Sequence, residues 1–88
     1  MRFEWDEVKR RNNIQKHGID FVDAVQVFYG DPSIIEDTRS EYGESRFWAI
    51  GLAKGIPLLV VHTYPNEHTI RIISARRATK QEQQYLFT

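Results

Sequence analysis

The second half of the sequence contains three β-rich segments joined by very short connections. The segments are SRFWAIGLA (45–53), LLVVHTY (58–64) and TIRIISAR (69–76), and the connections between them are KGIP and PNEH. A parallel crossover needs a dozen or more residues, whereas antiparallel neighbours need only a tight turn. The spacing therefore predicts an antiparallel meander with the most apolar segment, 58–64, at its centre. Gly51 indicates a bulge or a close backbone approach within the first of these strands.

Two helices are predicted before this meander. Asp6 is a suitable N-cap for a first helix that runs to about Lys16, because its carboxylate can accept from the free amides of the first turn. Asp20 is the predicted cap of a second helix, which Pro32 ends because proline cannot continue the hydrogen-bond ladder. The second helix has a continuous apolar face made of Phe21, Ala24, Val25 and Phe28.

Two short strands and a final helix complete the pattern. RFEW (2–5) and SIIED (33–37) are predicted strands, and Thr79 followed by Glu82 forms a capping-box pattern at the start of a short C-terminal helix. The resulting order is β-α-α-β-β-β-β-α, which is typical of the α+β class. At this length a single domain over residues 1–88 is expected.

The composition argues against several classes of protein. Cysteine is absent, so disulfides and thiolate metal sites are excluded, and His17, His62 and His68 lack the spacing of metal ligands. The glycines never approach the pattern of a phosphate-binding loop. No apolar run approaches the ~20 residues of a membrane span, and the first residues lack the apolar region of a signal peptide. We therefore expect no cofactor, no metal and no membrane association, and a cytoplasmic location.

Formal net charge is zero, but the charges are unevenly distributed along the chain. Residues 31–44 contain five acids and one base, whereas residues 68–81 contain four bases and no acid. Residues 9–17 add four bases and a histidine. This pattern fits a locally bipolar surface, and scattered surface charge is the alternative.

Arg76 and Arg77 stand side by side where the last predicted strand ends, just before the helix start at Thr79. Arginine suits planar, bidentate phosphate contacts, and the amides of a helix start also favour anions. Together with Arg71 the pair therefore suggests a phosphate clamp. The alternatives are a solvated pair, or a pair bridged to the acidic segment 31–44.

The two-residue period of a strand makes a further prediction about these arginines. If Ile70 and Ile72 face the core, Ser74 and Arg76 share their face, while Arg71 points to the opposite side. That arrangement mixes apolar and basic side chains on both faces. A bulge, or a strand that ends before Arg76, is the alternative.

Two histidines are candidates for proton transfer. His17 lies at the predicted C-terminal turn of the first helix, where a favourable interaction with the helix dipole is a sufficient structural reason for a histidine. The same position favours the charged form of the ring, which suits a proton donor or a phosphate binder. His62 lies on the most apolar strand, where a lone histidine is more often a buried, hydrogen-bonded residue than a catalytic one.

Four stretches of the chain, FEWD, KHGIDFVDA, the SRF hairpin and RIISARRAT before a terminal helix, resemble the BrnT family of toxins from type II toxin–antitoxin modules. The resemblance implies a RelE-like fold, in which N-terminal helices pack on a twisted antiparallel sheet. It also implies a BrnA-like ribbon-helix-helix antitoxin as partner, with operator DNA bound only through that antitoxin. The hairpin departs from the family pattern, because Ser45 precedes Arg46 where a glutamate is expected, although Glu44 is adjacent.

The resemblance further implies a ribonuclease that inhibits translation by cleaving RNA. RNA supplies its own nucleophile, the 2′-OH, so a metal-independent mechanism needs only charge stabilisation and proton transfer. The family's basic sheet positions match Arg71, Arg76 and Arg77, which are predicted to bind phosphate, and its KHG histidine matches His17. His17 and His62 are the predicted proton-transfer residues. A non-catalytic module that binds RNA or protein through the basic sheet face is the alternative function.

Overall fold

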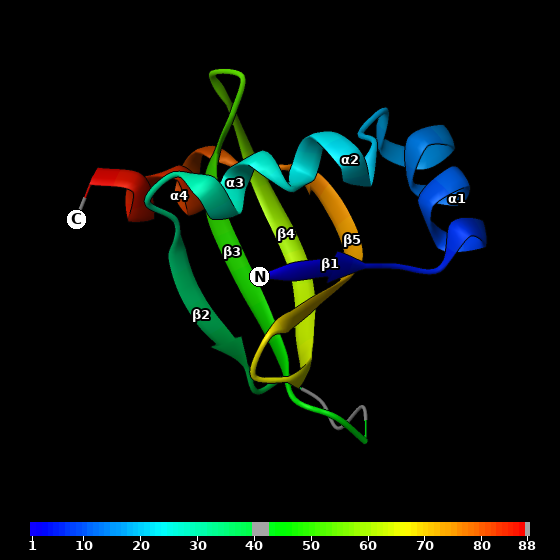
Figure 1. Ribbon diagram of the computed structural model, residues 1–88. Coiled ribbons are helices and arrows are strands. Elements are labelled where there is room, and N and C mark those ends of the chain that lie inside the picture. Colours follow the sequence, from blue (N-terminus) through cyan, green and yellow to red (C-terminus); the bar gives the residue numbers. More distant parts are fainter. Residues whose placement is uncertain (40–42, 88) are drawn as a thin grey trace.

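The computed structural model describes residues 1–39 and 43–87 (Figure 1). In chain order its elements are β1 (Arg2–Glu4), α1 (Glu7–His17), α2 (Phe21–Ala24), α3 (Gln26–Tyr29), β2 (Ser33–Asp37), β3 (Arg46–Ala53), β4 (Ile56–Asn66), β5 (Thr69–Arg77), α4 (Lys80–Gln83) and the 3₁₀ helix η1 (Gln84–Phe87). The predicted order is confirmed, except that the second helix is divided at Val25 into α2 and α3. Within the described ranges, no helix has the length and apolar character needed to cross a membrane.

The strands form one sheet in the order β1-β5-β4-β3-β2, so the apolar strand β4 is central, as predicted. Strands β2 to β5 pair in antiparallel fashion through short connections. The first strand joins the sheet differently, because β1 lies parallel to β5, with Glu4 beside Arg71. Local connection lengths say nothing about this pairing, which joins the two ends of the chain.

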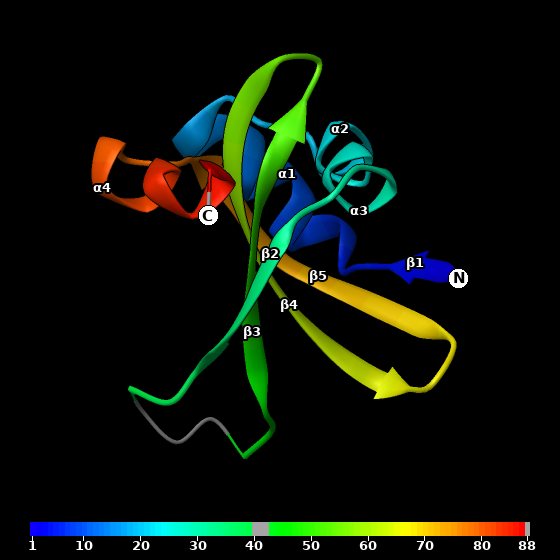
Figure 2. The same ribbon diagram turned by 90° about the vertical axis from the view of Figure 1, so that its left-hand side faces the viewer.

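Helices α2 and α3 lie on one side of the sheet and α4 on the other (Figure 2). The main core is formed between the sheet and the helices α2 and α3, and its largest fully buried side chains include Phe21, Val27, Leu58, Val60 and Ile72. A smaller apolar cluster on the opposite face contains Ile50, Leu59 and Ala78, against which Leu86 of η1 packs. Burial of apolar surface, at about 25 cal/mol per Å², is what holds these layers together.

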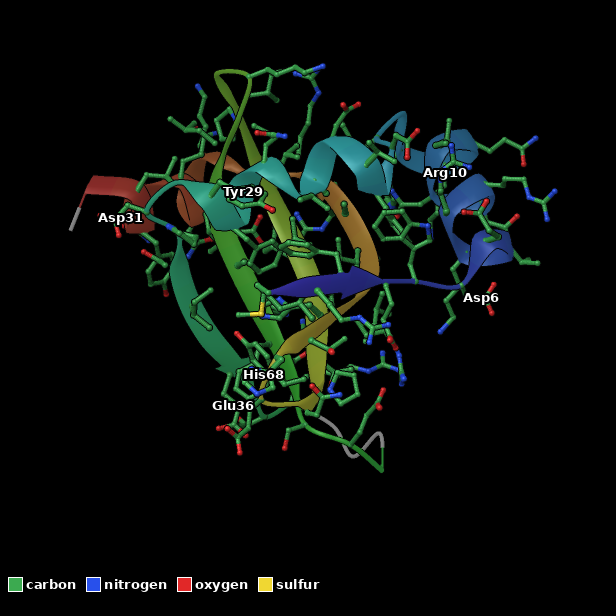
Figure 3. The ribbon with its side chains drawn as sticks, in the orientation of Figure 1. Asp6, Arg10, Tyr29, Asp31, Glu36 and His68 are labelled. Atoms are coloured by element: carbon green, nitrogen blue, oxygen red, sulfur yellow. The ribbon has the colours of Figure 1, made fainter. Side chains whose placement is uncertain are left out.

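Both ends of α1 are stabilised as the sequence predicts. The Asp6 carboxylate accepts hydrogen bonds from two amides of the first turn, at 2.8 and 3.2 Å. Gly18 follows the last turn with φ of 71°, a left-handed conformation that glycine adopts without steric cost. Figure 3 shows Asp6 at the start of the helix and Arg10 one turn further on. The Arg10 guanidinium donates to both carboxylate oxygens of Asp20, which links the helix to the start of α2.

Asn13 attaches α1 to the edge of β5. Its side-chain amide donates to the carbonyl of Ala75 at 2.8 Å, and its side-chain oxygen accepts from the Ala75 amide at 3.0 Å. The same Nδ2 donates to the Ile19 carbonyl at 2.9 Å. One side chain thus takes the place of a neighbouring strand beyond the point where β1 ends, and it satisfies buried backbone groups that would otherwise be costly.

A β-bulge in β5 decides which way its side chains point. Val61 of β4 is paired with Ser74, but the next residue, His62, is paired with Ile72. Ile73 is therefore the extra residue, and the alternation of faces changes phase there.

The bulge corrects the prediction that Ser74 and Arg76 share the face of Ile70. Ile70 and Ala75 both belong to the core beneath the helices. Arg76 is paired with Leu59, a member of the cluster on the opposite face, and Arg71 is paired there with Glu4 by an ion pair. Arg71, Ser74 and Arg76 consequently share the face away from α1 to α3, and the alternative of a bulge is confirmed.

The predicted close approach at Gly51 is confirmed. A Cβ atom placed on this glycine would lie 2.9 Å from Cγ1 of Val27 and 3.3 Å from Cβ of Pro32. Separations below 3.0 Å require a shift of one partner, and Val27 is fully buried. Glycine at this position lets α3 and the loop after it pack directly on β3.

Candidate functional site

The sheet face that points away from α1 to α3 carries the most distinctive polar side chains. We call it the open face, and its residues are Asp37 of β2, Arg46 and Trp48 of β3, Val61 and Thr63 of β4, and Arg71, Ser74 and Arg76 of β5. Helices α4 and η1 cover one end of this face. Over the rest of it, no helix of the described residues is present (Figure 2).

Arg76 is held by two carboxylate oxygens of Glu82. Its Nη1 and Nη2 donate to Glu82 Oε1 and Oε2 at 2.8 and 2.9 Å, and Nη1 also donates to the Arg77 carbonyl. Glu82 is at the same time part of the predicted capping box, in which it accepts from the Thr79 amide while the Thr79 hydroxyl accepts from the Glu82 amide. The strand end and the helix start are thus joined through one carboxylate.

These contacts keep the Glu82 carboxylate ionised. The hydrogen bonds from Arg76 and then the one from the Thr79 amide outweigh the effect of burial, and the pKa of Glu82 is lowered from 4.5 to about 2. A guanidinium has five N–H donors. Since the groups that accept from Arg76 bond to Nη1 and Nη2, its Nε has no acceptor among the described residues.

Arg71 is held by a carboxylate from the other end of the chain. Its Nε donates to Oε2 of Glu4 at 2.6 Å, and both side chains are partly exposed. Glu4 lies directly opposite Arg71 in the parallel β1–β5 register, so the position of β1 creates this pair. The partners of Arg71 and Arg76 therefore come from outside the acidic segment 31–44, of which residues 40–42 lie outside the described part of the chain.

Arg39 is a further arginine on the open face, in addition to Arg46, Arg71 and Arg76, and the sequence prediction did not include it. The guanidinium carbon of Arg39 lies 4.7 Å from the centre of the Trp48 ring, and Arg39 donates to both carboxylate oxygens of Asp37 at 3.0 and 3.2 Å. Arg39 belongs to an acid-rich segment and Trp48 to an apolar strand, so neither local pattern indicated a polar surface. Their proximity depends on the pairing of β2 with β3.

His62 lies on the opposite side of the sheet from the arginines of the open face. Its ring is fully buried and contacts Phe28 and Phe47, with centroid separations of 4.9 and 6.0 Å. Nδ1 lies 3.2 Å from the Val60 carbonyl and Nε2 lies 3.0 Å from the Tyr64 hydroxyl. Because a carbonyl can only accept, this arrangement suits a proton on Nδ1. Burial lowers the pKa of His62, which favours the neutral ring.

His17 and Arg77 occupy two further places. His17 ends α1 and lines a shallow cleft that Ser74 of β5 also lines, so it lies beside the strand that carries Arg71 and Arg76. Arg77 is exposed at the end of β5 and lines a different hollow, together with Lys54. The structure therefore brings Arg71 and Arg76 to one face with His17 next to their strand, and it separates Arg77 and His62 from them.

The described residues contain no group of three or more histidine, aspartate or glutamate side chains placed to hold a metal ion. The open face carries guanidinium groups, the Asp37 carboxylate, the hydroxyls of Thr63 and Ser74, and the aromatic ring of Trp48. Guanidinium groups held in fixed positions are suited to bind and stabilise an anion such as a phosphate.

The fold and the open face define the class: a small α+β protein that presents arginine side chains on the face of its sheet left free by the N-terminal helices. A family model described as the ribonuclease toxin BrnT of type II toxin–antitoxin systems matches residues 5–82. The crystal structure of the Brucella abortus ribonuclease toxin BrnT superimposes with a TM-score of 0.75 and 32% sequence identity, covering 91% of this chain and 99% of that chain. No curated protein sequence matches the chain.

The chain belongs to the BrnT family of ribonuclease toxins. It is thus the toxin of a type II toxin–antitoxin pair, and an antitoxin is its partner. The family resemblance seen in the sequence and the mixed α+β fold are both confirmed by these comparisons.

Proposed function

We propose that residues 1–88 form a single toxin domain, a metal-independent endoribonuclease that binds RNA on the open face and inhibits translation by cleaving it. The observation that carries this proposal is the placement of Arg71 and Arg76 on one face of β5, each held by a carboxylate from another element. Fixed guanidinium groups stabilise a developing negative charge without having to reorganise during the reaction.

In this mechanism the 2′-oxygen of a ribose attacks the adjacent phosphorus, and the bond from phosphorus to the 5′-oxygen of the next nucleotide breaks. The 2′-hydroxyl loses its proton and the leaving 5′-oxygen gains one, so the products are a 2′,3′-cyclic phosphate and a free 5′-hydroxyl. Arg71 and Arg76 stabilise the extra negative charge on the phosphoryl oxygens, an effect for which a single donor is typically worth about 10²–10³ in rate.

His17 is the proposed proton-transfer residue, because it lines the cleft that reaches Ser74 between the two arginines. Glu82 is a poor general base at neutral pH, since its pKa is held at about 2 and efficient proton transfer needs a pKa near the working pH. We assign His62 a supporting role beneath the sheet, because its buried ring has no surface that RNA can reach. Arg77 has no proposed contact with the phosphate.

The test is RNA cleavage in the presence of EDTA by the wild type and by alanine variants at Arg71, Arg76 and Arg77, with Arg11→Ala as the control. Arg11 is an exposed cation of α1 that forms no ion pair with a described residue. We expect wild-type cleavage in EDTA, losses of about 10²-fold or more for Arg71→Ala and Arg76→Ala, and much smaller changes for the other two. Full activity of both open-face variants would refute the assignment, and a large loss for Arg77→Ala would restore the adjacent pair as the clamp.

We further propose that the partner antitoxin is a BrnA-like protein with a ribbon-helix-helix region, which neutralises the toxin and carries the complex to operator DNA. The pair is expected in the cytoplasm, where the RNA substrate is, and away from membranes. Support comes from the family, which is defined as one half of a type II module. Expression of the chain alone should arrest growth, and co-expression of the neighbouring gene should restore it; normal growth without that gene would contradict the proposal.

A non-catalytic RNA- or protein-binding module is the second candidate. The observation in its favour is that Arg71 and Arg76 are both already paired with carboxylates, which reduces the net positive charge of the open face. The two functions differ in outcome: tight RNA binding by the wild type without any cleavage, together with tolerated expression, would favour the binding module.

A further inference from the structure

A shallow cleft of about 260 Å³ runs between α1 and β5, beside the open face. One side of it is a single face of α1, on which Lys9, Asn12, Lys16 and His17 follow one another at helical spacing. The other side is formed by Ile73 and Ser74 of β5. Two structural features shape this cleft: the bulge at Ile73, and the Asn13 side chain, which hydrogen-bonds α1 to the edge of β5.

The charge of this cleft differs from that of the open face. The residues that line it include two lysines and a histidine but no carboxylate. Lys9 and Lys16 form no ion pair within the described part of the chain, whereas Arg71 and Arg76 are each bound to a glutamate. Two acids lie at the start of α1: the Asp6 carboxylate accepts from amides of the first turn, and Glu7 is engaged by Arg10 and by the Trp5 indole. The cations of the cleft are thus left for a ligand from outside the chain.

The cleft also continues directly from the proposed cleavage site. Ser74 lines the cleft and shares the open face with Arg71 and Arg76. At a strand rise of about 3.3 Å per residue, its Cα lies roughly 7 Å from that of Arg76 and roughly 10 Å from that of Arg71. These separations are of the order of one nucleotide step along an extended single strand, so a strand bound at the arginines can place a neighbouring phosphate over Ser74.

We propose that the α1–β5 cleft binds the backbone of single-stranded RNA next to the scissile phosphate, as a second phosphate subsite. Lys9 and Lys16 supply the positive charge, and Asn12 and Ser74 supply hydrogen bonds to phosphate or ribose oxygens. The inference rests on the proposed function, because it extends the same RNA path. Its consequence for the substrate is that RNA which extends past the scissile bond is bound and cleaved better than a dinucleotide, which cannot occupy both places.

The experiment measures the binding of a short single-stranded RNA at a series of salt concentrations. The RNA carries 2′-O-methyl groups, so the nucleophile is blocked and binding is separated from cleavage. The variant Lys9→Gln with Lys16→Gln is compared with the wild type and with Arg11→Gln, which removes a charge from α1 outside the cleft. Thermal unfolding of each variant shows that the fold is retained.

For the loss of one phosphate contact on a single strand, the slope of log K against log salt concentration falls in magnitude by about 0.7. We expect this change for the double lysine variant and an unchanged slope for Arg11→Gln. The same double variant is expected to lose most of the preference of the wild type for a longer RNA over a dinucleotide. An unchanged slope in the double variant, or an equal change in both, would overturn the inference.

Failure of this inference can be told apart from failure of the proposed function. If the wild type cleaves RNA in EDTA but the double lysine variant binds with the wild-type slope, the cleft inference alone is wrong. If the wild type does not cleave RNA but the slopes differ as expected, the cleft binds RNA and the ribonuclease mechanism is wrong. Displacement of the RNA by a polyglutamate peptide of equal charge, as readily as by unlabelled RNA, would show that the cleft does not select phosphate and would overturn the inference.

Discussion

Replacing Glu82 by glutamine tests whether one carboxylate organises both the phosphate-binding Arg76 and the C-terminal helix. Glutamine keeps a side-chain oxygen that can accept from the Thr79 amide, so the capping contact is retained. It removes the negative charge and one of the two acceptors of the Arg76 guanidinium. The change therefore separates the ion pair from the helix cap.

The size of the effect follows from the pKa of Glu82. A shift from 4.5 to about 2 corresponds to an upper bound of about 3.4 kcal/mol, at about 1.36 kcal/mol per pKa unit. The Arg76 side chain is 36% exposed, so solvent screens the pair, and we expect a loss of about 1–2 kcal/mol in the free energy of unfolding. For a domain of this size, that loss lowers the melting temperature by about 4–16 °C.

The stabilisation by Glu82 depends on pH, and the direction of this dependence follows from its lowered pKa. Because the folded-state pKa lies below the ordinary value, the carboxylate contributes its full stabilisation above about pH 4.5, and the contribution is lost as the pH falls toward 2. Urea unfolding of the wild type and of Glu82→Gln at pH 7, 4.5 and 3 should therefore show a difference that shrinks with decreasing pH.

Glu36→Gln is the matched control, because Glu36 is an exposed carboxylate of β2 that forms no ion pair with a described residue. It should change the stability by less than about 0.5 kcal/mol. If the two variants lose the same stability, or if the loss in Glu82→Gln is independent of pH, the ion pair does not make the contribution inferred here. RNA cleavage by Glu82→Gln should also fall, since Arg76 is no longer held in position.

Three further predictions concern positions away from the arginines. Asn13→Ala should lower the free energy of unfolding by about 2–4 kcal/mol in urea titrations, because it leaves the buried amide and carbonyl of Ala75 unpaired, whereas the exposed neighbour variant Asn12→Ala should change it by less than about 0.5 kcal/mol. Gly51→Ala should cost about 1–3 kcal/mol through overpacking against Val27, and a melting temperature equal to that of the wild type would contradict the contact. Since burial lowers the pKa of His62, unfolding adds a proton to it at mildly acidic pH; stability should fall as the pH drops below about 6.5, and NMR of the ring should show it neutral in the folded protein there.

The pairing of each open-face arginine with a carboxylate has two opposing effects on function. It holds the guanidinium in one orientation, which lowers the reorganisation needed when a phosphate is bound. It also reduces the positive potential of the face, which weakens long-range attraction of RNA. The unpaired lysines of the α1–β5 cleft provide that attraction next to the site. In this proposal the lysines attract the RNA, and the open-face arginines position its phosphate.

The features of this protein that can be predicted from its sequence are those that depend on interactions between residues close together in the chain. The caps at Asp6 and Thr79 and the antiparallel order of β2 to β5 depend on residues close together in the chain. The central place of β4 follows from its apolar composition. Family motifs in the sequence likewise identified a ribonuclease toxin, because they are runs of adjacent residues.

The arrangement of the candidate site was decided by the tertiary structure. One extra residue in β5 reverses the direction of every later side chain, so the position of the bulge places Arg76, rather than Arg77, on the face of Arg71. The parallel pairing of β1 brings Glu4 to Arg71 across almost the whole length of the chain, and the packing of α3 on the sheet buries His62. Sequence patterns reflect interactions between residues that are near neighbours in the chain, whereas these contacts form only when distant segments pack together. The long-range contacts determine which of the predicted residues RNA can reach.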